Sequence, residues 1–342
     1  LVASTDEGYA DCPWRERGSY IGDSLVNLHV HALVTADFSV ARRVFRIFGE
    51  AQLENGQLPP VAPAWYRRPH EDFSLIWLIA LRDYWSLTGD ASLLEEMWAR
   101  VERLWASPVW QPGPGGLWNA VDTHVFLDWG KDPSEVEGRG NAALNLFRLG
   151  AAHATAEMAR VLGRPEQAAR FEEEAVFVRE ALENFLWDDE AGRFRPSLGA
   201  DTAAPHANVL ALRFGAGDPA RILAYLEPLL YRNFSYGIAH GERSGFLELY
   251  FMIYLLPALA GNGRYDLAER MIEEHYGFLR KRGHPTLNEC FSRAHRKAGS
   301  CCHSWSGAAA VYFARYLMGF RQEEPGCRDR WILDPVSPSV DR

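Results

Sequence analysis

The sequence predicts an all-α protein built as a ring of helical hairpins, an (α/α)6 toroid. Helical stretches follow one another through most of the 342 residues. We count about eleven after Ser24, close to the roughly twelve of a closed six-hairpin ring. Short turns alternate with long loops rich in proline and aromatic residues. Antiparallel pairs joined in this way place every long loop on one face, where a cleft can form.

Two apolar stripes at helical spacing, one on each side of a short turn, predict each hairpin. In the second, for example, Phe73, Trp77, Leu81 and Tyr84 recur at helical spacing. We read Asp90 and Asp218 as N-caps on the short-turn face. The expected hairpins are residues 24–48, 73–105, 141–185, 206–230 and 245–282, followed by a last helix from Trp305 to Met318.

The N-terminus and C-terminus are expected to be irregular. The missing helix of the ring would lie before Asp11, but residues 1–9 are too short for it, so the ring either closes irregularly or was trimmed. We place the barrel in residues 1–320 and a tail in 321–342, where 328–335 resembles the opening strand of a β-sandwich. A solenoid of hairpins is the competing architecture, but the repeats are uneven in length and share no motif.

Charge, apolar runs, cysteines and tryptophans each argue for or against a class of function. A net charge of −9 argues against a nucleic-acid partner. The most apolar run, 246–260, is too short for a membrane span and carries Glu248. Five cysteines without metal-type spacing predict a reduced compartment, no metal and no cofactor; because no leader is visible, we expect a cytoplasmic location. Twelve tryptophans, many in loops, are typical of a carbohydrate site.

The segment from Asp11 to Asp23 has the composition of a site. Acids and arginines alternate with Trp14 and Tyr20, and Pro13 and two glycines keep the segment from forming a regular helix. The plain alternative for Asp23 is an N-cap of the helix that starts at Ser24.

Converging loops would bring several carboxylates together. Glycoside hydrolysis needs two of them, one donating a proton to the leaving oxygen and one activating water. The first and last loops meet when a ring closes, so Glu16 and Glu289 would face each other. Glu289 also has apolar neighbours in the sequence, and these would partly desolvate its carboxyl group. The flanking arginines would lower the pKa of Glu16, and Asp11 and Asp23 could offset this. The other candidate acids are Asp72, Asp122, Asp128, Asp188, Asp189 and Glu242.

The motif from Asp11 through Arg15-Glu16-Arg17 to Gly22-Asp23 resembles the signature of the α-L-rhamnosidases of glycoside hydrolase family 78. Four further stretches agree with the pattern of this family and follow in the same order: residues 72–77, 126–129, 286–289 and 302–306. The similarity covers about residues 11–319. The resemblance implies an (α/α)6 barrel that inverts, with Glu16 as general acid and Glu289 as general base. It also implies sugar contacts from Asp11, Arg15, Tyr20, Asp23, Asp128, Trp129 and His303.

Two positions depart from that family pattern. Tyr20 stands where tryptophan is usual, and Asn288 stands where an aromatic residue is usual. The substrate is therefore expected to be a glycoside of rhamnose or of a closely related sugar. The alternatives are another six-hairpin glycosidase, a polysaccharide lyase, or a non-catalytic carbohydrate-binding remnant.

Overall fold

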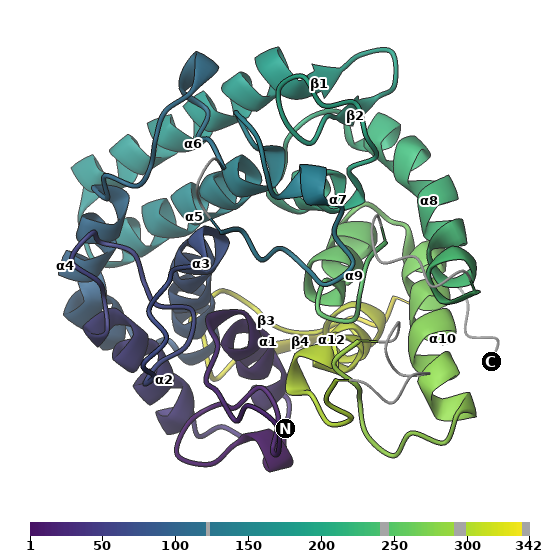
Figure 1. The fold of residues 1–342 in the computed structure, drawn as a ribbon. Coiled ribbons are helices and arrows are strands. Elements are labelled where there is room, and N and C mark those ends of the chain that lie inside the picture. The colour runs from purple at the N-terminus through teal and green to yellow at the C-terminus, as the bar shows by residue number, and fades with distance from the viewer. Residues whose placement is uncertain (121–123, 240–245, 291–298, 337–342) are drawn as a thin grey trace.

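The computed structural model, which describes residues 1–120, 124–239, 246–290 and 299–336, is a closed ring of helices (Figure 1). An inner layer surrounds the centre and an outer layer surrounds it in turn, which confirms the predicted toroid. The inner helices are α1 Ile21–His31, α3 Glu71–Thr88, α5 Ala142–Val161, α7 Pro205–Phe214, α9 Met252–Gly261 and α12 Ala308–Tyr312. The outer helices are α2 Ser39–Glu50, α4 Ser92–Trp105, α6 Pro165–Leu186, α8 Pro219–Ala239 and α10 Tyr265–Lys281.

The ring closes because each inner helix packs against the next, and α12 packs back against α1. Inner helices are covered on all sides, so their apolar residues do not form a single stripe; α3 buries Trp77 completely. Outer helices are amphipathic and turn one face to water. Among the described residues no full helix precedes α1, where residues Val2–Ser4 form only a single 3-10 turn.

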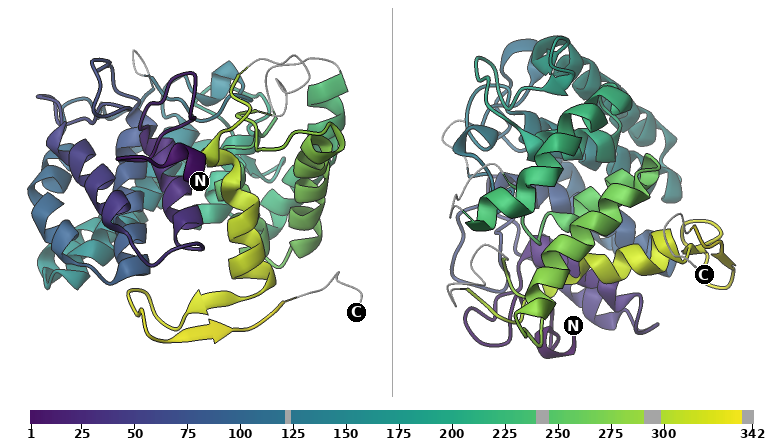
Figure 2. Two further views of the ribbon diagram at one scale, coloured as in Figure 1. Left: turned by 90° about the horizontal axis from the view of Figure 1, so that it is seen from below. Right: turned by 90° about the vertical axis from the view of Figure 1, so that its right-hand side faces the viewer.

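The inner helices are parallel to one another, so their N-termini share one end of the ring with the long loops. This end therefore collects residues from the first turns of α1, α3 and α7, among them Asp23, Asp72 and His206. Backbone N–H groups and the helix dipole favour anions at such an end. In Figure 2 (left) the β-hairpin of β3 Phe320–Gln322 and β4 Trp331–Leu333 lies at the opposite end of the molecule.

Three helix starts differ from the sequence prediction by three residues or more. The last helix, expected from Trp305 to Met318, is divided into a 3-10 helix Ser304–Gly307, α12 from Ala308 and a π-helix Phe313–Leu317. Helix α1 begins at Ile21 instead of Ser24, so Asp23 lies inside the first turn and is not an N-cap. Helix α9 begins at Met252 instead of 245, because the preceding segment gives its backbone donors to another loop. Phe246 N donates to Gly130 O at 3.1 Å, and Glu248 N donates to Asp128 Oδ2 at 2.8 Å.

The structure also bears on the predicted helix caps, the predicted short hairpin and the expected absence of a membrane span. Asp218 accepts from Ala220 N at 2.9 Å and caps α8 as expected, whereas the N-cap of α4 is Ala91, with Asp90 accepting from Ser92 N one residue earlier. The hairpin expected near Gly192 is present as β1 Trp187–Asp188 paired with β2 Arg193–Phe194. No described helix is both long enough and apolar enough to cross a membrane. The division into a barrel and a tail after 320 stays a prediction.

Candidate active site

The loop that carries Glu16 is held in shape by Asp11 and Gly18. Gly18 N donates to Asp11 Oδ1 at 2.7 Å, which ties the two ends of the loop together. A Cβ on Gly18 would lie 2.7 Å from the Tyr20 ring, so only glycine fits without a shift. The preceding Arg17 has a φ of 53°, in the left-handed region that non-glycine residues seldom adopt. Such backbone strain is typical of functional sites.

Ring closure brings the first and last loops into contact. Ser304 N donates to Asp11 O at 3.3 Å, and His303 Nε2 lies 2.9 Å from Asp23 Oδ1. Asp23 and His303 are both buried, and the Asp23 carboxylate is the main influence that raises the pKa of His303 against the opposing effect of burial. The last loop is therefore fastened to the first turn of α1 by a buried ion pair.

Glu289 is surrounded by hydrogen-bond donors. Its carboxyl group is 2% exposed. Oε2 accepts from Arg15 Nη2 at 2.7 Å and from Ser300 N at 2.9 Å, and Oε1 accepts from Trp129 Nε1 at 3.1 Å. Three donors from three loops fix this carboxyl group as an acceptor in one orientation.

Glu16 lies beside the same guanidinium but in a different environment. Its Oε1 is 3.1 Å from Arg15 Nη2, and its side chain is 39% exposed. Partial burial raises the pKa of Glu16 to about 7; Arg15 opposes the rise, while Asp11 and Glu289 add to it. Arg17 pairs instead with Asp6, at 3.7 Å. The two carboxyl groups thus converge on Arg15 from positions 273 residues apart in the sequence.

Trp129, which donates to Glu289, lies on a loop that buried polar side chains hold in place. Its side chain is 37% exposed, and its backbone N donates to Asp128 Oδ1 at 2.8 Å. Asp128 Oδ2 in turn lies 3.1 Å from His206 Nε2, and His206 Nδ1 lies 2.7 Å from Glu135 Oε2. These three ionisable side chains are completely buried. Asp128 therefore holds the backbone of Trp129 in place, and the predicted contact of Asp128 with sugar stays a prediction.

Sequence reasoning missed His206 and Glu135. Nothing in their local sequence distinguishes them; the one usable signal is that His206 opens an inner helix at the loop end of the ring. The other candidate acids lie in different places. Asp72 is buried and accepts from Phe126 N and Leu127 N, whereas Asp188 and Asp189 pair with surface arginines near β1. Asp122 and Glu242 lie outside the described residues.

The buried His206 predicts a pH effect on stability. With a carboxylate on each ring nitrogen, the pKa of His206 rises to about 9 although burial opposes the rise. Because this folded-state pKa exceeds the unfolded value of about 6.5, the stabilisation is complete below about pH 6.5 and is lost as pH rises through about 9. The difference is at most about 3 kcal/mol. Urea unfolding from pH 6 to 9.5 should show this decline.

Replacing His206 tests whether its imidazolium causes the decline in stability with rising pH. His206→Gln should be less stable at pH 6 and should lack most of the decline, because no imidazolium remains to titrate. The exposed His153 provides the control, since His153→Gln should keep the decline. An unchanged slope in His206→Gln would contradict the assignment of an imidazolium.

One group of described residues has the geometry for a metal ion. A ligand atom from each of Asp11, Cys12 and His303 lies within 4.8 Å of the others, and all three residues are buried. A carboxylate, a thiolate and an imidazole suit a zinc-like ion. The expectation of no metal and no cofactor stays a prediction.

A closed ring of α-helical hairpins, with two carboxyl groups that both contact Arg15 at its loop end, is the architecture of six-hairpin glycosidase domains. Residues 5–317 match the family model described as the bacterial alpha-L-rhamnosidase six-hairpin glycosidase domain. The chain belongs to this family. No curated protein matched the sequence.

Solved structures agree on the fold. The family 78 rhamnosidase of Bacillus sp. GL1 superposes with a TM-score of 0.81 at 21% identity, covering 94% of this chain and 34% of the other. The Klebsiella oxytoca rhamnosidase with rhamnose bound gives 0.76 at 20%, covering 91% and 60%. The Streptomyces avermitilis α-L-rhamnosidase complexed with L-rhamnose gives 0.74 at 19%, covering 96% and 31%. This chain thus spans less than two thirds of the length of each.

Proposed function

We propose that this chain hydrolyses glycosides and releases terminal α-L-rhamnose or a closely related sugar with inversion of configuration. The observation that carries the proposal is the convergence of Glu16 and Glu289 on Arg15 in a family of rhamnosidase domains. Glycosidases need one protonated and one ionised carboxyl group across the scissile bond. The different surroundings of Glu16 and Glu289 suit these two roles.

Glu16 is the general acid in this proposal. A pKa of about 7 leaves a large fraction of its carboxyl groups protonated at neutral pH, so that the proton can pass to the glycosidic oxygen. Its 39% exposed side chain is accessible to a substrate. The nearby Asp11 carboxylate raises the pKa of Glu16 and thus favours its protonated form.

Glu289 is the general base. Because Arg15, Ser300 and Trp129 all donate to it, the carboxylate form is the one that fits its surroundings. In the reaction a water oxygen bonds to the anomeric carbon and gives its proton to Glu289, while the bond to the leaving oxygen breaks and that oxygen takes the proton of Glu16. The chemistry needs no cofactor.

The distance between the two carboxyl groups bears on inversion. Since one Arg15 nitrogen lies 2.7 Å from Glu289 Oε2 and 3.1 Å from Glu16 Oε1, these two oxygens are no farther apart than the sum of those distances. Inverting enzymes keep their carboxyl groups roughly 6.5 to 9.5 Å apart, leaving room for a water. The oxygens of Glu16 and Glu289 nearest to Arg15 lie closer together than that range, nearer to the roughly 5 to 5.5 Å of retaining enzymes. The separation therefore does not support inversion, and the proposal of inversion rests on the resemblance to the family.

The sugar would lie between Trp129 and the first loop. The exposed part of the Trp129 ring offers a face for stacking. Among the described residues, the buried His303 Nδ1 has no hydrogen-bond partner, which suits a contact with a sugar hydroxyl. Asp11, Tyr20 and Asp23 complete the proposed contacts.

A panel of aryl glycosides tests the function. We expect release of the aryl group from the α-L-rhamnoside at least about a hundredfold faster than from matched α-glucoside, α-mannoside and β-galactoside. Proton NMR of the fresh product should show the β-anomer first. Release from another glycoside alone would move the assignment to a different sugar, and a first product with α-configuration would refute inversion. An ultraviolet-absorbing unsaturated product would indicate a lyase, and binding without turnover a carbohydrate-binding remnant.

A further inference from the structure

Three buried side chains of the first and last loops form a cluster that the proposed mechanism does not fully use. Asp11, Cys12 and His303 are each at most 3% exposed, and each offers one ligand atom within 4.8 Å of the other two. Cys12 is a free thiol with no part in the proposed reaction. Because the two loops meet only when the ring closes, the cluster exists only in the folded protein.

Two of these side chains have a ligand atom without a partner. His303 Nε2 lies 2.9 Å from Asp23 Oδ1, which leaves Nδ1, and this buried nitrogen has no hydrogen-bond partner in the described part of the chain. Asp11 Oδ1 accepts from Gly18 N at 2.7 Å, whereas the buried Oδ2 also lacks a partner within the described ranges. Buried polar atoms without a partner are rare in proteins, so this pair indicates a bound group.

Asp23 gives His303 the surroundings of a metal ligand. A histidine that binds a metal through one ring nitrogen usually donates to a carboxylate or a carbonyl through the other, which fixes its tautomer and orientation. The buried Asp23 makes this contact with Nε2 from the first turn of α1. In neutral His303, Nε2–H therefore donates to Asp23, and Nδ1 carries the lone pair that an ion needs.

Charge around the cluster favours a cation. Burial lowers the pKa of His303, but the carboxylates of Asp23, Glu289 and Asp11 together raise it above its usual value. Three carboxylates therefore lie close enough to stabilise positive charge at this position. A metal ion would take up the same attraction.

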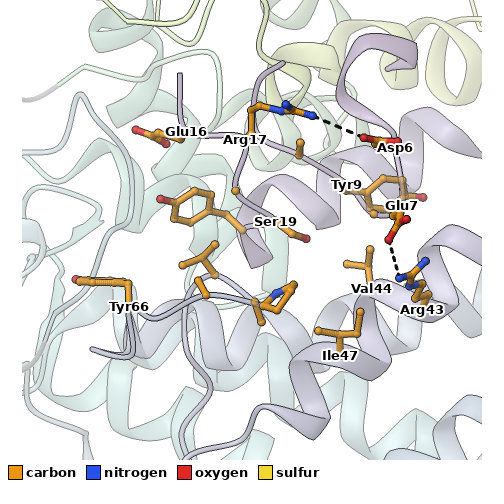
Figure 3. A pocket seen from close by; sticks show the side chains of 18 of the residues that line it. Asp6, Glu7, Tyr9, Glu16, Arg17, Ser19, Arg43, Val44, Ile47 and Tyr66 are labelled. Atoms are coloured by element: carbon orange, nitrogen blue, oxygen red, sulfur yellow. Dashed lines mark hydrogen bonds and ion pairs between the residues drawn. The ribbon is translucent and has the colours of Figure 1, made fainter. Parts of the chain in front are cut away.

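The two arginines of the first loop are engaged outside the cluster. Figure 3 shows Arg17 turned away from Glu16, and it pairs with Asp6 at 3.7 Å. Arg15 contacts both Glu16 and Glu289, at 3.1 Å and 2.7 Å, so two carboxyl groups share its single positive charge. The positive charge of this loop is therefore already paired with carboxyl groups that do not belong to the cluster.

The ligand types select a zinc-like ion. Zinc binds thiolate, imidazole and carboxylate, whereas magnesium and calcium take oxygen ligands alone. Ligand atoms of a tetrahedral zinc ion are about 3.3 to 3.8 Å apart, given bonds of about 2.0 to 2.3 Å. Because the three atoms of the cluster lie within 4.8 Å of one another, shifts of about 1 Å bring them onto one ion. A fourth position stays open for water.

We propose that Asp11, Cys12 and His303 form a binding site for a zinc-like divalent cation, and that this ion inhibits the enzyme. The ion is no cofactor, because it takes the side chains that the proposed function gives to the sugar. It bonds to the Cys12 sulfur, Asp11 Oδ2 and His303 Nδ1, and the protons that the thiol and the imidazolium lose pass to solvent. The inhibition rests on the proposed function, whereas the binding of the ion does not.

The ion would also weaken the proposed acid. Partial burial raises the pKa of Glu16 to about 7, and the Asp11 carboxylate contributes to the rise although Arg15 opposes it. A cation on Asp11 would cancel this contribution, so less of Glu16 would be protonated at neutral pH. Inhibition therefore has two causes, the loss of sugar contacts and the loss of a protonated acid.

Cobalt tests the binding, because Co²⁺ occupies zinc sites and absorbs in the near ultraviolet when a thiolate binds it. Titration of the metal-free chain with cobalt chloride should give a sulfur-to-cobalt band that saturates at one equivalent. Cys12→Ser keeps a side chain of similar size, but it should lose the band and bind zinc chloride about tenfold more weakly or worse in a calorimeter. Cys301→Ser, at an exposed free cysteine, is the matched control and should bind as the wild type does.

Activity tests the inhibition. Without zinc, Cys12→Ser should hydrolyse an aryl rhamnoside within about twofold of the wild-type rate, and it should need about tenfold more zinc or higher for half inhibition. Magnesium chloride should inhibit neither protein, because the site offers a thiolate and an imidazole. Rhamnose should weaken the binding of cobalt to the wild type. Equal sensitivity of both proteins to zinc would place the inhibitory ion elsewhere and would overturn the proposal.

A measurement on the wild type covers the case in which Cys12→Ser does not fold. X-ray absorption at the zinc edge should show one sulfur at about 2.3 Å together with nitrogen and oxygen ligands at about 2.0 Å. A zinc ion without a sulfur ligand, or a wild-type Kd weaker than about 1 mM, would overturn the metal site even if rhamnose is released. Failure to release rhamnose, with the cobalt band intact, would overturn the proposed function alone.

Discussion

Glu289→Gln should lower kcat/KM on an aryl α-L-rhamnoside by about 10³ to 10⁴, the upper part of the range that a positioned general base supplies. Glutamine has nearly the same shape, but its amide cannot take a proton from water. Arg15 would also lose the negative charge that it contacts at 2.7 Å, although the amide oxygen of glutamine can still accept its hydrogen bond. Initial rates and circular dichroism, measured together, would separate lost chemistry from lost folding.

Azide provides a specific check on the role of the base. As an anion it needs no deprotonation, so it should restore part of the activity of Glu289→Gln and yield a rhamnosyl azide of inverted configuration. The exposed Glu173 on α6 offers a matched control, because Glu173→Gln should behave as wild type. Wild-type rates in Glu289→Gln would show that another group activates water.

Glu16→Gln should have an effect that depends on the leaving group. For a poor leaving group, such as an alkyl aglycone, kcat/KM should fall by about 10³ or more, since nothing protonates the departing oxygen. For rhamnosyl fluoride the loss should be at most about tenfold, because fluoride leaves with little proton assistance. Rates on both substrates for wild type and variant give the comparison.

The pH profile follows from the raised pKa of Glu16. A general acid works in its protonated form, so wild-type kcat/KM should decline as pH rises above about 7. Glu16→Gln should lack this decline, because the amide does not titrate. If the decline persisted in Glu16→Gln, a different group would be the acid; equal losses on fluoride and alkyl rhamnosides would lead to the same conclusion.

Buried ion pairs support the loops that carry this chemistry. Asp23 with His303 fastens the last loop to α1, and Asp128 with His206 and Glu135 holds the loop of Trp129. Breaking one member of a buried pair leaves an unpaired charge and is costly. The loops can therefore present exposed side chains without losing their geometry.

The sequence by itself determined the architecture and the family. Apolar periodicity is a local property, so helices such as residues 73–87 can be recognised without the fold, and the alternation of turns and loops then implies a ring. The motif from Asp11 to Asp23 pointed to the family that the comparison over residues 5–317 confirms. Local periodicity does not determine where each helix starts. The start of α9, for example, depends on a hydrogen bond from Glu248 N to Asp128 in another loop.

Only the tertiary structure decided what the individual site residues contact. Asp23 looked like a cap from its neighbours, yet ring closure pairs it with His303, 280 residues away. Asp128 also acquires a partner that its neighbours do not suggest, since its Oδ2 lies 3.1 Å from Nε2 of the buried His206. The pKa of Glu16 also depends on tertiary structure: adjacent arginines alone predict a lowered pKa, whereas burial together with Asp11 and Glu289 raises it to about 7. Desolvation and Coulomb energies depend on distances through space, and these are set only when the ring closes.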